Sequence, residues 1–246
     1  MTGGYRHPKA LWHPSPNFNA RRHGGPADMV VLHHTAMATA VAARDRLCDP
    51  DPGEGLSPVS CHYVISETGD LWQLVDESDR AWHAGAGAWG AVWDVNSHSI
   101  GIELANTSAH PYPEPQMAAL EVLLPGLLSR WSIPPERVIG HSDMAPDRKS
   151  DPGPRFDWRR LALRGLSIWP GASTGEARTS GRDEQRFCED LKTIGYVPPE
   201  GAGLDLMLRV FRMRFCPWAE GQDLSAQDCR VAADLAARYP VDRGIR

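Results

Sequence analysis

The chain has 246 residues, of which 41% are hydrophobic and 23% are charged. This is the composition of a folded protein with one or two domains, and it excludes a chain that is disordered throughout. The formal net charge of −5 provides no overall basic field, so nucleic acid is not expected as a partner.

The apolar runs fall well short of the ~18 residues that a membrane span needs, so no span is predicted. The basic N-terminus has no apolar segment behind it, which argues against a secretory signal peptide. With Met1 as the start, the cytoplasm is the expected compartment and the periplasm is the alternative. The five cysteines include no C-x-x-C pair, so we expect free thiols rather than a disulfide framework.

Short apolar strands alternate with helical segments along residues 1–168. Apolar patterns predict strands at MVVLHH, at two places in CHYVISETGDLWQLV, at SIGIELA and at RVIGHS. Helical spacing of apolar residues predicts one helix over 39–47 and another over 117–131. This alternation is typical of an α/β fold around a central sheet.

A stretch of small and polar residues, 169–182, has no hydrophobic period and is interpreted as a linker. Beyond it, residues 183–246 carry three apolar stripes at helical spacing. The last stripe follows Ser225, an expected N-cap, with Asp228 in the capping-box position. We therefore expect an α/β domain over 1–168 and a small three-helix domain over 183–246.

Two histidines and an aspartate are candidates for a metal site. His33 lies at the end of a predicted strand, His141 follows another, and Asp151 comes shortly afterwards. Two imidazoles and one carboxylate leave a fourth zinc position open for a water, as hydrolytic zinc sites do. On spacing alone, histidines that cap strands and an aspartate that forms a turn before Pro152 account for these residues at least as well.

Four segments resemble, in order and approximate separation, the zinc-dependent N-acetylmuramoyl-L-alanine amidases of the amidase-2 family: VVLHHTA, AWHAGAGAW, NSHSIGIELAN and GHSDMAPDRKSDPGPRFDW. This family also contains T7-type phage lysozyme and the animal peptidoglycan recognition proteins. The resemblance implies a central mixed sheet flanked by helices, and a Zn²⁺ ion held by His33, His141 and Asp151. The aspartate ligand, where phage-type members have cysteine, resembles the bacterial branch of the family.

The resemblance also implies roles for residues around the zinc. Glu103 lies among alternating apolar residues, where an unpaired carboxylate is costly, and it matches the family's proton acceptor. Lys149 resembles the lysine that stabilises the anionic oxygen of the tetrahedral intermediate. His83 resembles a substrate-cleft residue, and Asn96 is expected to help shape the same rim.

Three further positions are interpreted with the resemblance in view. His34 faces the opposite side of its strand from His33, so it is expected either to line the substrate cleft or to pack. Cys61 stands where phage-type enzymes carry a tyrosine implicated in catalysis, and it is interpreted as a small buried residue. Residues 183–246 resemble a peptidoglycan-binding domain, with a plain stabilising subdomain as the alternative.

The predicted function is hydrolysis of the amide bond between the lactyl group of N-acetylmuramic acid and L-alanine. Peptidoglycan fragments, in particular anhydromuropeptides formed in recycling, are the expected substrates. A non-catalytic muropeptide-binding module of the same family is the alternative. A glycosidase that uses Glu103 with a second carboxylate would instead cut sugar links and ignore chelators.

Overall fold

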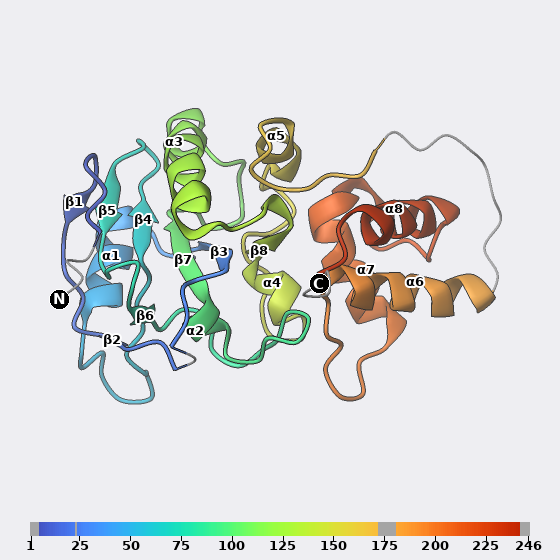
Figure 1. Ribbon diagram of the computed structural model, residues 1–246, viewed down its shortest axis with the longest axis horizontal. Coiled ribbons are helices and arrows are strands. Elements are labelled where there is room, and N and C mark those ends of the chain that lie inside the picture. Colours follow the sequence, from blue (N-terminus) through green and yellow to red (C-terminus); the bar gives the residue numbers. More distant parts are fainter. Residues whose placement is uncertain (1–4, 23, 172–180, 242–246) are drawn as a thin grey trace.

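The computed structural model describes residues 5–22, 24–171 and 181–241 (Figure 1). At its centre lies a six-stranded sheet in the order β1-β5-β4-β7-β3-β8. The strands of this sheet are β1 (Leu11–Trp12), β3 (Met29–His34), β4 (Tyr63–Ile65), β5 (Leu71–Gln73), β7 (Ser99–Leu104) and β8 (Val138–Gly140). Strands β4, β7, β3 and β8 run parallel, and β5 is antiparallel to β4, so the sheet is mixed. A separate antiparallel ladder joins β2 (Phe18–Asn19) and β6 (Arg80–Ala81).

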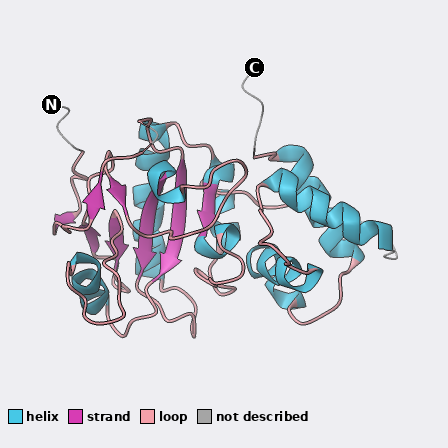
Figure 2. Ribbon diagram, turned by 90° about the horizontal axis from the view of Figure 1, so that it is seen from below, coloured by secondary structure: helices cyan, strands magenta, loops and turns pink. Residues whose placement is uncertain are grey.

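Helices flank this sheet, and three more are grouped beyond its β8 edge in both views (Figures 1 and 2). The first group is α1 (Ala40–Cys48), α2 (Val95–His98), α3 (Glu114–Trp131), α4 (His141–Met144) and α5 (Trp158–Leu163). The second group is α6 (Gly181–Ile194), α7 (Leu204–Phe215) and α8 (Ala226–Arg238), and single 3-10 turns occupy Pro135–Arg137 and Pro217–Ala219. The predicted α/β class is thus confirmed. Within the described residues, no helix is both long and apolar enough to span a bilayer.

Local signals set the ends of these elements. The side-chain oxygen of Thr39 accepts a hydrogen bond from the Ala42 amide at 3.1 Å and begins α1. At α8 the capping box expected from Ser225 and Asp228 is present in both directions. Helix α3 continues through Pro125, and Leu120 and Leu124 on it are fully buried. Helical periodicity therefore located α1, α3 and α8 correctly.

The side chains of β3 alternate between two hydrophobic clusters. Val30 and Leu32 pack with α3, whereas Val31 belongs to the cluster that continues into the C-terminal helices. Because side chains two residues apart on a strand share a face, His33 lies on the face opposite α3. Strand β7 pairs with β3 in a register that sets Glu103 beside His33, on the same face. The sheet therefore presents these two side chains together.

The C-terminal helices pack against α4 and the β8 edge. Phe187 and Phe211 share one buried cluster with Met144 of α4. The carboxylate of Asp143 accepts hydrogen bonds from the Arg214 guanidinium at 2.7 Å and from the Tyr196 hydroxyl at 2.8 Å. Most of the predicted linker, residues 172–180, lies outside the described residues, and the division of the chain at 169–182 stays a prediction.

The buried ion pair between Arg214 and Asp143 leads to a stability prediction. In Arg214→Met, the Asp143 carboxylate, which is 1% exposed, loses its cation, so the free energy of unfolding should fall by about 3–5 kcal/mol. Arg22→Ala breaks an exposed ion pair with Asp94 and should lower the free energy of unfolding by at most about 1 kcal/mol. Urea unfolding of both variants measures the difference. Equal losses in the two variants would contradict the stabilising role of this contact.

Candidate metal centre

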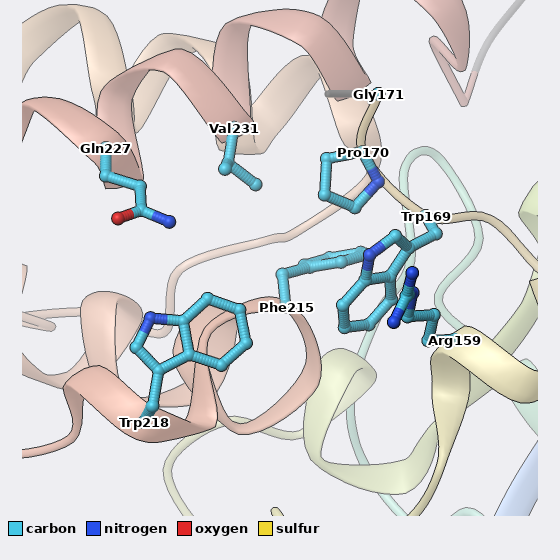
Figure 3. A pocket seen from close by; sticks show the side chains of 8 residues that line it. All are labelled: Arg159, Trp169, Pro170, Gly171, Phe215, Trp218, Gln227 and Val231. Carbon is cyan, nitrogen blue, oxygen red and sulfur yellow. The ribbon is translucent and has the colours of Figure 1, made fainter. Parts of the chain in front are cut away.

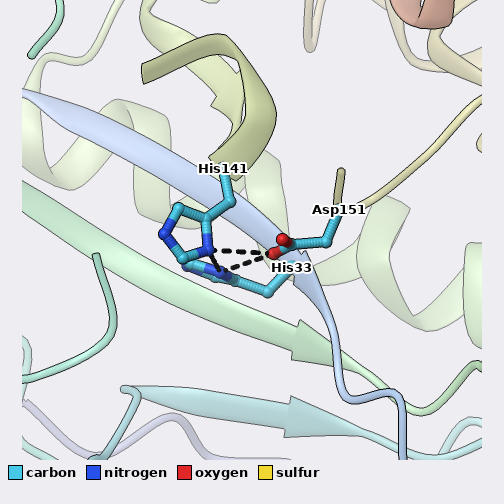
Figure 4. A group of neighbouring side chains, drawn as sticks. All are labelled: His33, His141 and Asp151. Atoms are coloured by element: carbon cyan, nitrogen blue, oxygen red, sulfur yellow. Dashed lines mark hydrogen bonds and ion pairs between the residues drawn. The ribbon is translucent and has the colours of Figure 1, made fainter. Parts of the chain in front are cut away.

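Three side chains far apart in the sequence converge at the carboxyl ends of the parallel strands (Figure 4). Nδ1 of His33 lies 2.9 Å from Nδ1 of His141 and 3.0 Å from Oδ2 of Asp151. Nδ1 of His141 is also 3.0 Å from that oxygen. All three residues are buried, and they form a group that could hold a metal ion. The structure thus brings together the three residues that the resemblance implied as ligands.

The fold positions each of the three side chains. His33 is near the end of β3, and His141 begins α4 directly after β8, the strand that neighbours β3. The loop that carries Asp151 is tied to α4, because the Ser142 amide donates a hydrogen bond to the Asp151 carbonyl at 2.9 Å. Parallel strands end at the same edge of a sheet, so the two imidazoles meet there.

The outer nitrogens of both imidazoles have protein partners. Nε2 of His141 lies 2.8 Å from the Ala84 carbonyl, which can only accept, so this nitrogen carries the proton of a neutral ring. Nδ1 of His141 then presents a lone pair to the other two residues. Nε2 of His33 lies 3.0 Å from Nδ1 of His83. The Ala84 carbonyl also accepts from Arg148 at 2.6 Å. Metal-ligating histidines characteristically have such partners behind them.

The electrostatics of the group suit a cation. Burial and the neighbouring His141 lower the pKa of His33 to about 4, so its ring is neutral at pH 7. Lone pairs held about 3 Å apart repel one another unless a positive charge lies between them. Zinc bonds of ~2.0–2.1 Å set tetrahedral ligand atoms ~3.3 Å apart, so this donor set fits the ion.

Glu103 is a half-buried residue whose carboxyl lies beside the group. Its Oε2 atom is buried and has no hydrogen-bond partner within the described part of the chain. Burial, reinforced by the charge of Asp151, raises the pKa of Glu103 to about 8, and the charge of Lys149 acts in the opposite direction. A carboxyl in such surroundings can both hold and release a proton near neutral pH.

Lys149 and His34 lie close enough to the group to interact electrostatically with it. The ammonium of Lys149, a half-exposed residue of the loop before Asp151, acts on the pKa of Glu103, His33 and His34. His34 is half-buried, and neither of its ring nitrogens has a hydrogen-bond partner among the described residues. The catalytic role expected for Lys149 and the substrate contact expected for His34 stay predictions.

His83 and Asn96 lie behind the imidazoles of the metal centre, and each is more than nine-tenths buried. The side-chain oxygen of Asn96 accepts hydrogen bonds from the backbone amides of His83 and Ala84, both at 2.9 Å. Their expected contact with substrate stays a prediction. Cys61 is fully buried and donates a hydrogen bond to the Tyr63 carbonyl at 3.1 Å, as a small core residue would.

Three contributors around the histidines were not identified from sequence: the Ala84 carbonyl, Ser99 and Gly101. Ser99, Gly101 and Glu103 alternate along β7 with Ile100 and Ile102, which pack in the cluster on the opposite face. Small and polar residues at every second position of an otherwise apolar strand indicate a face that does not pack against core. That alternation was available in the sequence, whereas a backbone carbonyl leaves no sequence signal.

Comparisons with known proteins identify a family that this chain resembles. The family model described as N-acetylmuramoyl-L-alanine amidase matches residues 23–154. The amidase AmiD of Escherichia coli is 34% identical over 209 residues, which are 75% of this chain and 76% of AmiD. The 1,6-anhydro-N-acetylmuramyl-L-alanine amidase AmpD of Enterobacter cloacae is 32% identical over 160 residues, covering 60% of this chain and 86% of AmpD.

Solved structures give the same result for the fold. The complex of E. coli AmiD with the substrate anhydro-N-acetylmuramic acid-L-Ala-D-gamma-Glu-L-Lys aligns with a TM-score of 0.77 and 31% identity. The alignment covers 89% of this chain and 92% of AmiD. By its sequence and its fold, the chain belongs to the N-acetylmuramoyl-L-alanine amidase family.

Proposed function

We propose that this chain is a zinc-dependent amidase that hydrolyses the bond between the lactyl group of N-acetylmuramic acid and L-alanine. The observation that carries the proposal is the convergence of His33, His141 and Asp151 beside Glu103, whose Oε2 atom has no hydrogen-bond partner among the described residues. A binding module needs neither an open metal site nor a proton acceptor beside it. The geometry therefore favours catalysis over the non-catalytic alternative.

His33, His141 and Asp151 would hold the Zn²⁺ ion. When bound, such an ion lowers the pKa of water toward ~7 and polarises a carbonyl group. Glu103 accepts the proton of the attacking water and returns it to the alanine nitrogen, which must be protonated to leave. The ammonium of Lys149 stabilises the negative charge that develops on the carbonyl oxygen.

We propose soluble anhydromuropeptides as the principal substrates. AmpD of Enterobacter cloacae is named for the 1,6-anhydro sugar, and the AmiD complex contains an anhydromuramyl tripeptide. The cytoplasm, where recycling of such fragments would take place, is the proposed compartment.

The C-terminal helices offer a second surface for the glycan. A groove of about 350 Å³ lies between α5, residues 169–171 and the helices α7 and α8 (Figure 3). It shares Arg159, Trp169 and Trp218 with an adjoining groove of about 410 Å³. Flat indole faces beside a guanidinium suit sugar rings and their polar substituents. We propose that residues 183–246 hold the glycan of larger peptidoglycan fragments here.

The metal-ligand assignment can be tested with Asp151→Ala. Removal of the carboxylate leaves two ligands, so we expect loss of bound zinc together with loss of amidase activity. Asp147→Ala, an exposed change on the same loop, should retain both. Elemental analysis measures zinc, and mass spectrometry of digested muropeptide measures the released stem peptide. A zinc-loaded, active Asp151→Ala enzyme would show that another group is the third ligand.

The proton-transfer assignment can be tested with Glu103→Gln. This change preserves the size of the side chain but removes its basicity, so kcat should fall by about 100- to 10,000-fold while zinc stays bound. The exposed change Glu54→Gln serves as the control and should leave kcat unaltered. Near-native turnover by Glu103→Gln would refute its role as proton acceptor.

The proposed glycan groove can be tested with Trp218→Ala. Trp218 is 61% exposed, so its removal should weaken co-sedimentation with polymeric peptidoglycan by about tenfold and leave hydrolysis of a soluble muropeptide unchanged. Leu163→Ala, an exposed apolar change on α5 outside the groove, is the matched control. Unaltered binding by Trp218→Ala would favour a purely stabilising role for the helices.

A further inference from the structure

Both candidate ligand histidines contact the same two-residue segment, His83–Ala84. Nε2 of His33 meets the ring of His83 at 3.0 Å, and Nε2 of His141 meets the carbonyl of Ala84 at 2.8 Å. One short stretch of chain therefore controls the outer nitrogens of both imidazoles. In the contact with Ala84, the proton must lie on Nε2 of His141, because a carbonyl oxygen cannot donate a hydrogen bond. The contact between His33 and His83 needs a further argument, because either ring could donate.

Ser99 decides the direction of that contact. Its hydroxyl lies 2.6 Å from the Val95 carbonyl and donates its single proton there. The Ser99 oxygen is also 3.2 Å from Nε2 of His83, so it must accept a proton from that nitrogen. A neutral His83 with its proton on Nε2 has a lone pair on Nδ1. It therefore accepts from Nε2–H of His33, which leaves Nδ1 of His33 unprotonated and directed at the metal position.

The surroundings hold His83 in this place. Asn96 accepts from the backbone amides of His83 and Ala84, as described above, and fixes the segment. The His83 ring lies over Gly101, where an added Cβ would be only 2.5 Å from its Cγ atom. The ring meets that of His33 edge-on, with centroids 5.0 Å apart and planes at 81°. A buried ring seated on a glycine between two hydrogen bonds has little freedom to turn.

We infer that His83 is a positioning residue, which holds His33 in the Nε2–H form and thereby sets the affinity of the centre for its metal. The chain of hydrogen bonds runs from the Val95 carbonyl through Ser99 and His83 to His33. The inference rests on the proposed role of His33 as a metal ligand. It places His83 behind the candidate metal centre, where it acts through His33.

Zinc affinity of matched variants tests the inference. His83→Leu removes the acceptor, so zinc should bind roughly 10- to 100-fold more weakly in competition with a chromogenic chelator. In His83→Asn the side-chain oxygen falls near the position of Nδ1, so this variant should recover most of the affinity. Gly101→Ala displaces the ring without deleting a hydrogen-bonding group and should weaken binding as His83→Leu does. Circular dichroism and urea unfolding identify any variant that fails to fold.

The proton position can be observed directly in the unaltered protein. Long-range ¹H–¹⁵N correlation spectra of the metal-free chain at pH 7 should show the proton of His33 on Nε2. A proton on Nδ1 would overturn the inference, and so would wild-type zinc affinity in a folded His83→Leu variant. Because this spectrum is recorded on the unaltered protein, it locates the proton of His33 even if every variant misfolds. A chain that passes both tests but hydrolyses no muropeptide would refute the proposed function alone.

Discussion

The convergence of three candidate metal-ligand atoms is the constraint on which the centre of this structure depends. Two imidazole nitrogens and one carboxylate oxygen lie within 3.0 Å of each other in a buried position. Each of the three residues, or the loop that carries it, makes a further contact with the protein. His141 donates to a backbone carbonyl, His33 contacts His83, and the loop of Asp151 is tied to α4.

Both the sheet and the C-terminal helices position the side chains of the candidate metal centre. Helix α3 occupies one face of the central strands with apolar contacts, and the other face carries polar side chains along β7 and at the end of β3. The C-terminal helices act through Asp143, which follows His141 on the short helix α4 and accepts from Arg214 and Tyr196. The helices that carry the proposed glycan groove thus also support the helix that carries a candidate metal ligand.

The surroundings of the three candidate ligands also account for the raised pKa of Glu103. Its side chain lies on the same face as His33 and is half-buried, and its pKa is raised to about 8 by burial and by the charge of Asp151. A cation held by the neighbouring residues would favour the ionised carboxylate, which is the form that accepts a proton. Under the proposed mechanism, binding of a metal would therefore favour the form of Glu103 that accepts a proton.

Much of the secondary structure was determined by sequence alone, because helix and strand periods and the Ser225–Asp228 cap act over a few residues. The ligand set was identified through the family resemblance, since spacing permitted a structural interpretation of the same residues. Strand alternation separated His33 from His34 but did not say which of them faces the site. Only the tertiary structure shows that His33 faces the site, because α3 packs on the opposite face of β3, which carries Val30 and Leu32. It also placed His83 and Asn96 behind the histidines, because contacts between residues as far apart in sequence as His33 and Asp151 follow strand order and register, which no local pattern encodes.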